Sequence, residues 1–246
     1  MDVKLNGNIL NCKNNGEVFA IGKNVGGISG SIKENVGTQI TNCINIGNII
    51  GEKENVGGIV GNAMPSTVVT NCHNKGNVKA KCNTLNNSMC GGIVGNLGGI
   101  NVSITYCSNS GSIYGEGEYV GGIIGVIAKK NNETPNTIVQ YCFNIGEIIG
   151  AKRVGGIIGK IAGNKGGTIT HCYNRGSVTG ETEVGSVACA VSNAENEHVL
   201  GHLYYLSSLN LGAINGEDIA DKNITSTTKE LNSFEEFKKW ITQFTI

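Results

Sequence analysis

Two histidines stand four residues apart in the segment HVLGH, at His198 and His202. On a helix this spacing brings two imidazoles onto one face, and in zinc proteases a glutamate directly after the first histidine supplies the general base. Val199 occupies the place of that glutamate, and the segment has the composition of a strand, in which a four-residue step creates no such face. We therefore expect the two histidines to pack against neighbouring residues rather than to bind a metal.

The cysteines are the next candidates for chemistry, since a thiolate can ligate a metal or act as a nucleophile. Cys72 adjoins His73, and His171 adjoins Cys172. Adjacent residues of a strand point to opposite faces, so neither pair is expected to share a metal. Six cysteines stand in equivalent sequence contexts, which argues against one specialised nucleophile and favours small buried hydrophobic side chains.

The acidic residues predict no catalytic pair either. Polysaccharide-active enzymes built on a parallel β-helix need clustered charged residues on one outer face. We find no such column across neighbouring repeats, and we expect Glu52, Glu54, Glu116 and Glu118 to lie in solvated turns between strands. The run GNLGG lacks the strand-turn-helix setting of a phosphate loop. The sequence thus predicts a protein that is not an enzyme, with no catalytic residue, no cofactor and no metal site.

The cysteines instead mark a repeat. Each of the six opens the pattern C-x-N-x-G-x-(I/V), which recurs at steps of 29 to 35 residues, and a second block such as VGGIVG follows about fourteen residues after each. The predicted structural-repeat residues are Cys12, Asn14, Gly16, Cys43, Asn45, Gly47, Cys72, Asn74, Gly76, Cys107, Asn109, Gly111, Cys142, Asn144, Gly146, Cys172, Asn174 and Gly176.

The repeat predicts the fold. Its constant residues fall at every second position, which is the period of a strand with one constrained face. A unit of this length cannot bury its own apolar face but can do so when stacked on copies of itself. We therefore predict an all-β, parallel β-solenoid of about six to seven rungs. Inward Ile and Val would fill the core, and the Asn residues would form an amide ladder. Gly would allow positive φ at corners, and the Gly-Gly pair would let the chain turn where a Cβ would clash.

The repeats span residues 1–203 in this prediction, and residues 204–246 form a C-terminal capping segment. Its text TSTTKELNSFEEFKKWITQF carries apolar residues at three- and four-residue steps, and Ser233 with Glu236 has the spacing of a capping box. We expect an amphipathic helix over 233–244. Because a solenoid needs a different terminal unit to close its core, this helix is predicted to lie over the last rung.

The joined words VGGIVG and NCINIGNIIG resemble the GLUG motif of bacterial surface proteins and of some IgA-cleaving metalloproteases. The resemblance covers about residues 5–200, and it transfers no catalytic residue. It implies a noncatalytic, extracellular or cell-surface repeat module that acts as a rigid scaffold or adhesin-like binding domain. Two alternatives stay open: a β-helical polysaccharide-active enzyme, and a repeat region that positions substrate for an IgA-type metallopeptidase.

Composition narrows the possible partners. Lys and Arg together number 19, as do Asp and Glu, so no basic excess favours nucleic acid. The sequence contains no run of 18 apolar residues, so it predicts no membrane span. An unknown host or matrix protein or a glycan is the expected partner, bound through variable outward residues or the predicted loops 78–89 and 128–136. The first repeat begins close to Met1, which suggests that other domains flank this chain in a longer parent protein.

Stacked equivalent cysteines each have two neighbours, so no pairing is selected, and we expect the six repeat cysteines to be mostly reduced thiols. If a disulfide exists, Cys82 and Cys90 are the likelier pair, because they flank a predicted loop.

Overall fold

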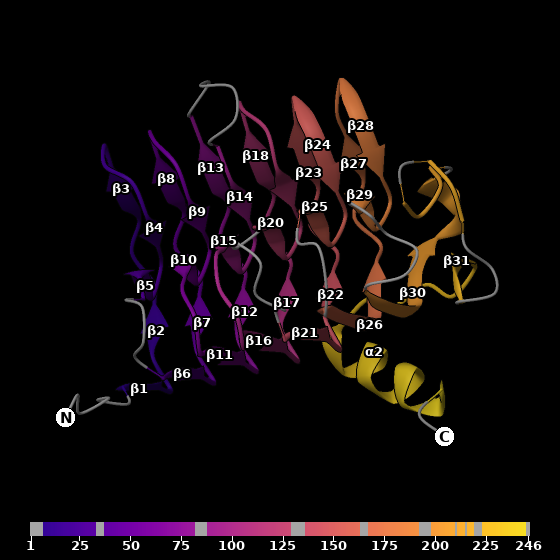
Figure 1. Cartoon of the computed structure of the whole chain (residues 1–246), viewed down its shortest axis with the longest axis horizontal. Helices are drawn as coiled ribbons and strands as arrows, with labels where there is room; N and C mark the ends of the chain where they lie inside the picture. Colours follow the sequence, from indigo (N-terminus) through magenta and orange to yellow (C-terminus); the bar gives the residue numbers. More distant parts are fainter. Residues whose placement is uncertain are drawn as a thin grey trace.

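The computed structural model describes residues 7–32, 37–81, 88–128, 136–162, 167–191, 198–209, 211–214, 216–218 and 223–244. The chain winds through successive rungs whose strands stack into a long parallel β-solenoid (Figure 1). One α-helix lies near the C-terminus. The predicted fold class is therefore confirmed.

Each rung begins with two short strands on either side of a sharp corner. The strands before the corner are β1 (Gly7–Leu10), β6 (Thr38–Thr41), β11 (Thr67–Thr70), β16 (Ser103–Thr105) and β21 (Thr137–Gln140). Those after it are β2 (Lys13–Asn14), β7 (Ile44–Asn45), β12 (His73–Asn74), β17 (Ser108–Asn109) and β22 (Phe143–Asn144). Two longer strands run through the corner, β26 (Gly167–Asn174) and β30 (Val199–Leu206), and β31 (Ile224–Thr227) pairs with β30.

The other strands form three six-stranded sheets. The first contains β3 (Val18–Ala20), β8 (Ile49–Gly51), β13 (Val78–Ala80), β18 (Ile113–Gly115), β23 (Ile148–Gly150) and β27 (Val178–Thr179). The second contains β4 (Val25–Gly26), β9 (Val56–Gly57), β14 (Cys90–Gly91), β19 (Val120–Gly121), β24 (Lys152–Gly155) and β28 (Thr182–Gly185). The third contains β5 (Ser29–Ser31), β10 (Val60–Ala63), β15 (Val94–Leu97), β20 (Ile124–Ile127), β25 (Ile158–Ile161) and β29 (Ala188–Val191).

Register follows the repeat. The strand pairs are parallel, and each repeat residue lies beside its equivalent in the next rung, as Asn45 lies beside both Asn14 and Asn74. Three sheets are six strands deep, so five rises separate their first and last rungs. A 3-10 turn, η1 (Ser207–Leu209), follows β30. The α-helix, α2 (Phe234–Ile241), comes after β31 and continues directly into a second 3-10 turn, η3 (Thr242–Phe244). Among the described residues, no helix has the length and apolarity needed to cross a membrane.

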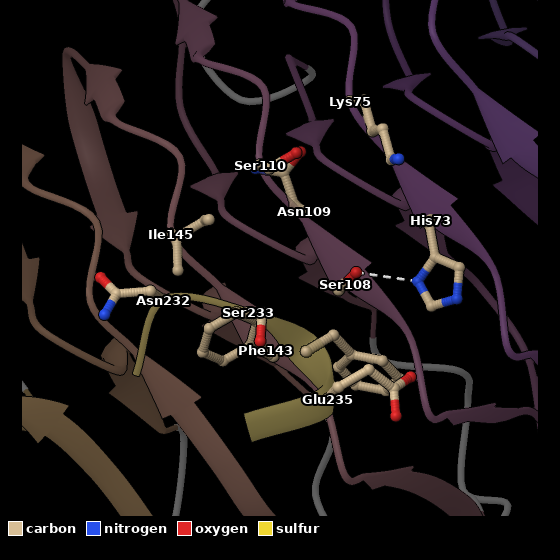
Figure 2. A pocket seen from close by; sticks show the side chains of 11 residues that line it. His73, Lys75, Ser108, Asn109, Ser110, Phe143, Ile145, Asn232, Ser233 and Glu235 are labelled. Carbon is tan, nitrogen blue, oxygen red and sulfur yellow. Dashed lines mark hydrogen bonds between the residues drawn. The ribbon is translucent and has the colours of Figure 1, made fainter. Parts of the chain in front are cut away.

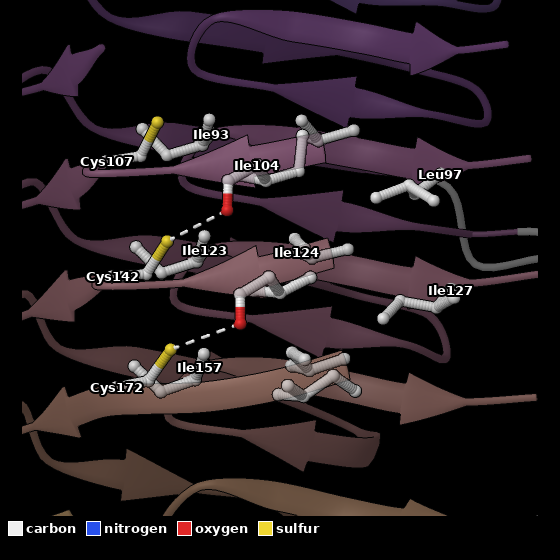
Figure 3. Close-up of a cluster of buried hydrophobic side chains, with 14 of the residues drawn as sticks. Ile93, Leu97, Ile104, Cys107, Ile123, Ile124, Ile127, Cys142, Ile157 and Cys172 are labelled. Carbon is white, nitrogen blue, oxygen red and sulfur yellow. Dashed lines mark hydrogen bonds between the residues drawn. The ribbon is translucent and has the colours of Figure 1, made fainter. Parts of the chain in front are cut away.

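The core is the column of inward Ile, Val and Cys side chains. Figure 3 shows Cys107, Cys142 and Cys172 stacked along the solenoid, each beside an isoleucine of the opposite wall. The Cys142 thiol donates to the Ile104 carbonyl oxygen of the preceding rung at 3.7 Å. Five of the six repeat cysteines are buried as predicted, whereas Cys12 is exposed, because it lies on the outermost described rung.

The predicted asparagine ladder is present. Each amide donates one Nδ2–H to the Oδ1 of the next rung, from Asn14 through Asn45, Asn74, Asn109 and Asn144 to Asn174, at 2.7 to 2.8 Å. Each also donates to the carbonyl of the glycine two residues later, as Asn109 does to Gly111 at 2.8 Å. Because both polar ends of every buried amide are satisfied within the stack, the column fixes the register of the rungs.

The positive φ predicted for the corner glycines is wrong, whereas the crowding predicted at the Gly-Gly pair is confirmed, since a Cβ on Gly58 would overlap the Gly92 carbonyl oxygen. Gly216 is the glycine with positive φ among the described residues, and it lies outside the repeats. Repeat glycines are required by crowding instead: a Cβ on Gly47 would overlap the Gly16 carbonyl oxygen of the neighbouring rung. One left-handed position is instead the residue before each repeat cysteine and before Leu203, which lies beside Cys172 in the next rung. It is occupied by Asn11, Asn42, Asn71, Tyr106, Tyr141, His171 and His202, with φ between 50° and 56°.

Four of these corner residues stack on one another and form what we call the corner ladder: Tyr106, Tyr141, His171 and His202. Their ring centroids lie 4.8, 5.0 and 4.7 Å apart along the solenoid. A left-handed conformation is unfavourable for tyrosine and histidine, so packing must hold it. The ring stack supplies this packing on the outer edge of the corner, while the following cysteine is anchored in the core.

The C-terminal helix forms as predicted but lies elsewhere than expected. It does not lie over the last rung; it packs along the outer face of the rungs (Figure 1). Phe143, Tyr173 and Tyr204 are large outward residues on three successive rungs, and Phe237 and Trp240 of α2 cover them. These outward rings give the helix an apolar surface to cover, and at the end of the stack β31 extends the sheet.

The loop predicted at 78–89 is wrong at its start, because residues 78–80 form β13 within a sheet and Val78 and Ala80 are buried. Residues 82–87, including Cys82, and residues 129–135 of the predicted loop 128–136 lie outside the described residues. Cys90 is a buried free thiol in the core.

Candidate functional site

The repeat residues build the scaffold and leave little for a ligand to contact. The buried repeat cysteines face the core, and the asparagine amides are committed to their ladder. Any site must therefore use outward residues, as the sequence indicated. Among the described residues, a groove that could serve as such a site lies where α2 begins, on the outer face of β12, β17 and β22.

Here the outer face and the start of α2 enclose a groove of about 370 Å³ (Figure 2). Its floor is formed by outward residues of successive rungs, including His73, Ser108 and Phe143. One wall is formed by residues 232–235, which lead into the first turn of α2. The groove thus joins parts of the chain that are far apart in sequence, and it exists because the helix packs along the side of the solenoid.

A chain of hydrogen bonds leads from outside the groove to His73 and Ser108 of its floor. Asn71 donates through Nδ2 to Asn42 Oδ1 at 2.8 Å, which leaves its own Oδ1 to accept from His73 Nε2 at 3.2 Å. His73 then carries its proton on Nε2, and its Nδ1 accepts from the Ser108 hydroxyl at 2.8 Å. Burial lowers the pKa of His73, and the charges of Lys75 and Lys238 act in the same direction. The imidazole is therefore neutral at neutral pH.

The wall is held by a capping arrangement at the start of α2. The Ser233 hydroxyl accepts from the Glu236 N–H at 3.2 Å, and the Glu236 carboxylate accepts from the Asn232 N–H at 2.9 Å. This confirms the capping-box pair read from the sequence, with the return bond reaching Asn232. Because both ends of the turn are tied, residues 232–235 present a fixed edge to the groove.

The groove has both apolar and polar components. The Phe234 ring lies 5.1 Å from the His73 ring and 6.4 Å from the Phe143 ring, measured between centroids. Lys75 and Glu235 contribute one charge of each sign, and Ser108 and Ser110 contribute hydroxyl groups. Such a surface can pack against a ring or chain and hydrogen-bond to its substituents. The His73–Ser108 contact also has the form in which a base activates a hydroxyl nucleophile.

The histidines considered for metal binding lie apart. His198 is buried and its Nδ1 accepts from the Gly167 N–H at 3.3 Å, whereas His202 belongs to the corner ladder. His202 lies within β30, in agreement with the strand expected from the sequence. Within the described ranges, no cluster of three or more His, Cys, Asp or Glu side chains could hold a metal ion.

One acidic residue contradicts its predicted environment. Glu118 is only 3% exposed, and its carboxylate accepts from Arg153 Nη1 at 2.8 Å. Arg153 also donates to Glu183 at 2.8 Å, and Lys152 lies within 3.8 Å of Glu118. Charges of alternating sign thus stack on successive rungs and allow the carboxylate to be buried. Aligning the residues before each VGG block brings these charges into two adjacent columns, Glu118 with Lys152 and Arg153 with Glu183.

Comparisons with known proteins agree with this architecture. Residues 150–179 match the family model of the GLUG motif, which confirms the resemblance seen in the sequence. The structure is similar to the crystal structure of "a putative immunoglobulin A1 protease from Bacteroides ovatus", with a TM-score of 0.60 and 17% sequence identity. That similarity covers 94% of this chain and 69% of the other. No curated protein matches the chain. The chain is thus a β-solenoid with a GLUG motif.

Proposed function

We propose that this chain is a noncatalytic, extracellular binding module displayed at a bacterial surface, and that it binds a glycan in the groove beside α2. The groove is the observation that carries the proposal. It is the place where outward residues of three rungs meet a second, fixed wall. The regular rungs serve as a rigid support that holds the floor in register.

A glycan suits the chemistry of the groove better than a strongly charged ligand. A sugar ring has an apolar face of C–H groups and a rim of hydroxyl groups. Phe234 supplies a partly exposed aromatic surface, while Ser108, Ser110 and the charged ends of Lys75 and Glu235 supply donors and acceptors. The two charges offset each other, so a neutral ligand meets no net repulsion.

Binding of the whole chain to a glycan array, followed by titration calorimetry with the best glycan, tests the proposal. Lys75→Ala removes a groove donor and is expected to weaken binding about tenfold or more. Lys13→Ala is the matched control, because Lys13 is an exposed outward lysine two rungs away on the same face. Equal losses in both variants, or no glycan bound with a Kd below about 1 mM, would rule out the groove as a glycan site.

The noncatalytic part of the proposal has its own test. The chain is incubated with a fluorophosphonate probe, which labels activated serines, and with the bound glycan. Neither labelling nor cleavage is expected. Labelling that disappears in Ser108→Ala and persists in Ser110→Ala would identify Ser108 as an activated nucleophile and overturn this part.

A second candidate function is a repeat region that positions substrate for an IgA-cleaving peptidase. The similarity in fold to the Bacteroides ovatus protein favours it. Surface plasmon resonance on immobilised human IgA1, with IgG as the control, distinguishes the two. Selective binding to IgA1 that survives removal of its glycans would support the second candidate over the first.

A further inference from the structure

The far end of α2 rests on two stacked imidazoles. His171 and His202 of the corner ladder lie 4.7 Å apart between ring centroids, with 18° between their planes. His202 also faces the Phe244 ring at 6.2 Å, just beyond the end of α2. The C-terminal turn of the helical segment is therefore seated on a pair of titratable groups.

His171 is poorly placed to carry a proton. Both of its ring nitrogens are shielded from solvent, and among the described residues neither makes a hydrogen bond of good geometry. Its ring is held between Tyr141 on one side and His202 on the other. Burial lowers the pKa of His171, His202 acts in the same direction, and the main chain of Phe244 acts against both. A positive charge here would be shielded from water, would have only the Phe244 main chain as a weak acceptor among the described residues, and would lie beside a second imidazole.

The His171–His202 pair is faced by side chains and main chain from the preceding rung, from η3 and from β30. Tyr141 faces His171 from the preceding rung, and the Phe244 main chain faces it from η3. His202 faces His171, Phe244 and the Tyr204 hydroxyl, which lies 3.3 Å from its Nδ1. These described neighbours carry no carboxylate that would stabilise an imidazolium. Acid therefore destabilises the packing at this position.

We propose that the stacked His171–His202 pair is an acid-sensitive latch that holds the C-terminal end of α2 against the solenoid and thereby regulates the groove. A group whose pKa is lowered on folding stabilises the folded arrangement above its ordinary pKa, and this stabilisation is lost as the pH falls. The latch thus holds above about pH 6.5 and releases below it. Release loosens the helix whose first turn forms the groove wall.

Trp240 provides the readout, because it is the single tryptophan of the chain and its ring lies 5.0 Å from the Tyr204 ring, edge to face. In the whole chain without ligand, its emission is expected to shift to the red between about pH 7.5 and about pH 5, while far-UV circular dichroism stays constant. Emission that does not change in this range would overturn the latch. Loss of the β signal at the same pH would also overturn it, because the solenoid itself would then be unfolding.

A double variant tests the residues. His171→Tyr with His202→Tyr continues the tyrosine stack of the two preceding rungs with side chains that stay neutral in acid, so the emission shift should disappear. His198→Gln is the control, because His198 lies outside the corner ladder, and it should keep the shift. Retention of the shift in the double variant would overturn the assignment, and its own spectrum at neutral pH reports whether it folds.

The consequence for the groove rests on the proposed function and is measured separately. The best glycan from the array should bind more weakly at about pH 5 than at about pH 7.5 in the native chain, but not in the double variant. Absence of any glycan binding would refute the proposed function and leave the fluorescence result standing.

Discussion

The Phe237 ring of α2 stacks on the Phe143 ring of β22, with 5.2 Å between centroids and 20° between planes. Both side chains are almost completely buried, although Phe143 points away from the solenoid core. The contact belongs to an apolar cluster on the outside of the rungs, separate from the core. It explains both the position of α2 and the existence of the groove at its first turn.

Phe237→Ala should release α2 without unfolding the rungs. The variant loses ring contacts to Phe143 and Tyr173, worth about 3 kcal/mol or more in a buried site. Trp240 emission should shift to the red, while the main thermal transition seen by circular dichroism changes little. Lys239→Ala, on the exposed side of the same helix, should leave both signals unchanged. A main transition lowered together with the Trp240 signal would show that α2 and the rungs unfold as one unit.

Asn109→Ala should lower the stability of the rungs. The substitution leaves Asn74 Nδ2 without its acceptor in the next rung and leaves Asn144 Oδ1 and the Gly111 carbonyl without a donor. We expect the free energy of unfolding to fall by about 2 kcal/mol or more in urea melts. Asn15→Ala, at an exposed position, should change it by less than about 0.5 kcal/mol. Equal effects would mean that the ladder does not stabilise the stack.

Gly111→Ala tests why glycine recurs in the repeat. A Cβ at this position would overlap the Gly76 carbonyl oxygen of the neighbouring rung, so the rungs must separate locally. The expected loss is about 1–3 kcal/mol or more, measured by thermal or urea unfolding. Gly22→Ala is the control, since a Cβ there meets nothing within 4 Å. A neutral Gly111→Ala would contradict the crowding explanation.

The repeat cysteines should differ sharply in reactivity. In the native chain a thiol reagent at about pH 8 should modify the exposed Cys12 quickly and the buried thiols only after denaturation. Burial raises the pKa of Cys43 to about 11 and places those of Cys107 and Cys172 well above their usual value, so few of these three thiols ionise. The hydrogen bond with Cys107 lowers the pKa of Cys72, but its side chain is completely buried and therefore out of reach of the reagent. One free sulfhydryl or fewer in the denatured, unreduced chain would show instead that these cysteines are paired.

The proposed latch and these substitutions address separate parts of the molecule. The Asn109→Ala and Gly111→Ala variants change contacts between neighbouring rungs. The Phe237→Ala variant and the His171–His202 double variant instead change the attachment of α2 to the rungs. A single unfolding transition that responds equally to both groups would show that the solenoid and α2 form one cooperative unit.

The sequence by itself determined the solenoid, its register and its amide ladder. Residues such as Asn45 and Cys72 recur in identical contexts because each packs against its own equivalent in the next rung. Periodicity in sequence therefore maps directly onto contacts in space. The helix over 233–244 was equally readable, since its cap and its apolar spacing are local signals.

Only the tertiary structure decided where that helix lies, which outward residues form a groove, and which charges are buried. His73 and Ser108 were recognisable as outward residues, but their approach to residues 232–235 depends on a contact between distant segments. The sequence predicts a solvated charge at Glu118, because its partners, Arg153 and Lys152, lie one rung away. Outward positions do not repeat, so no periodic pattern encodes their neighbours, and their environment follows only from packing.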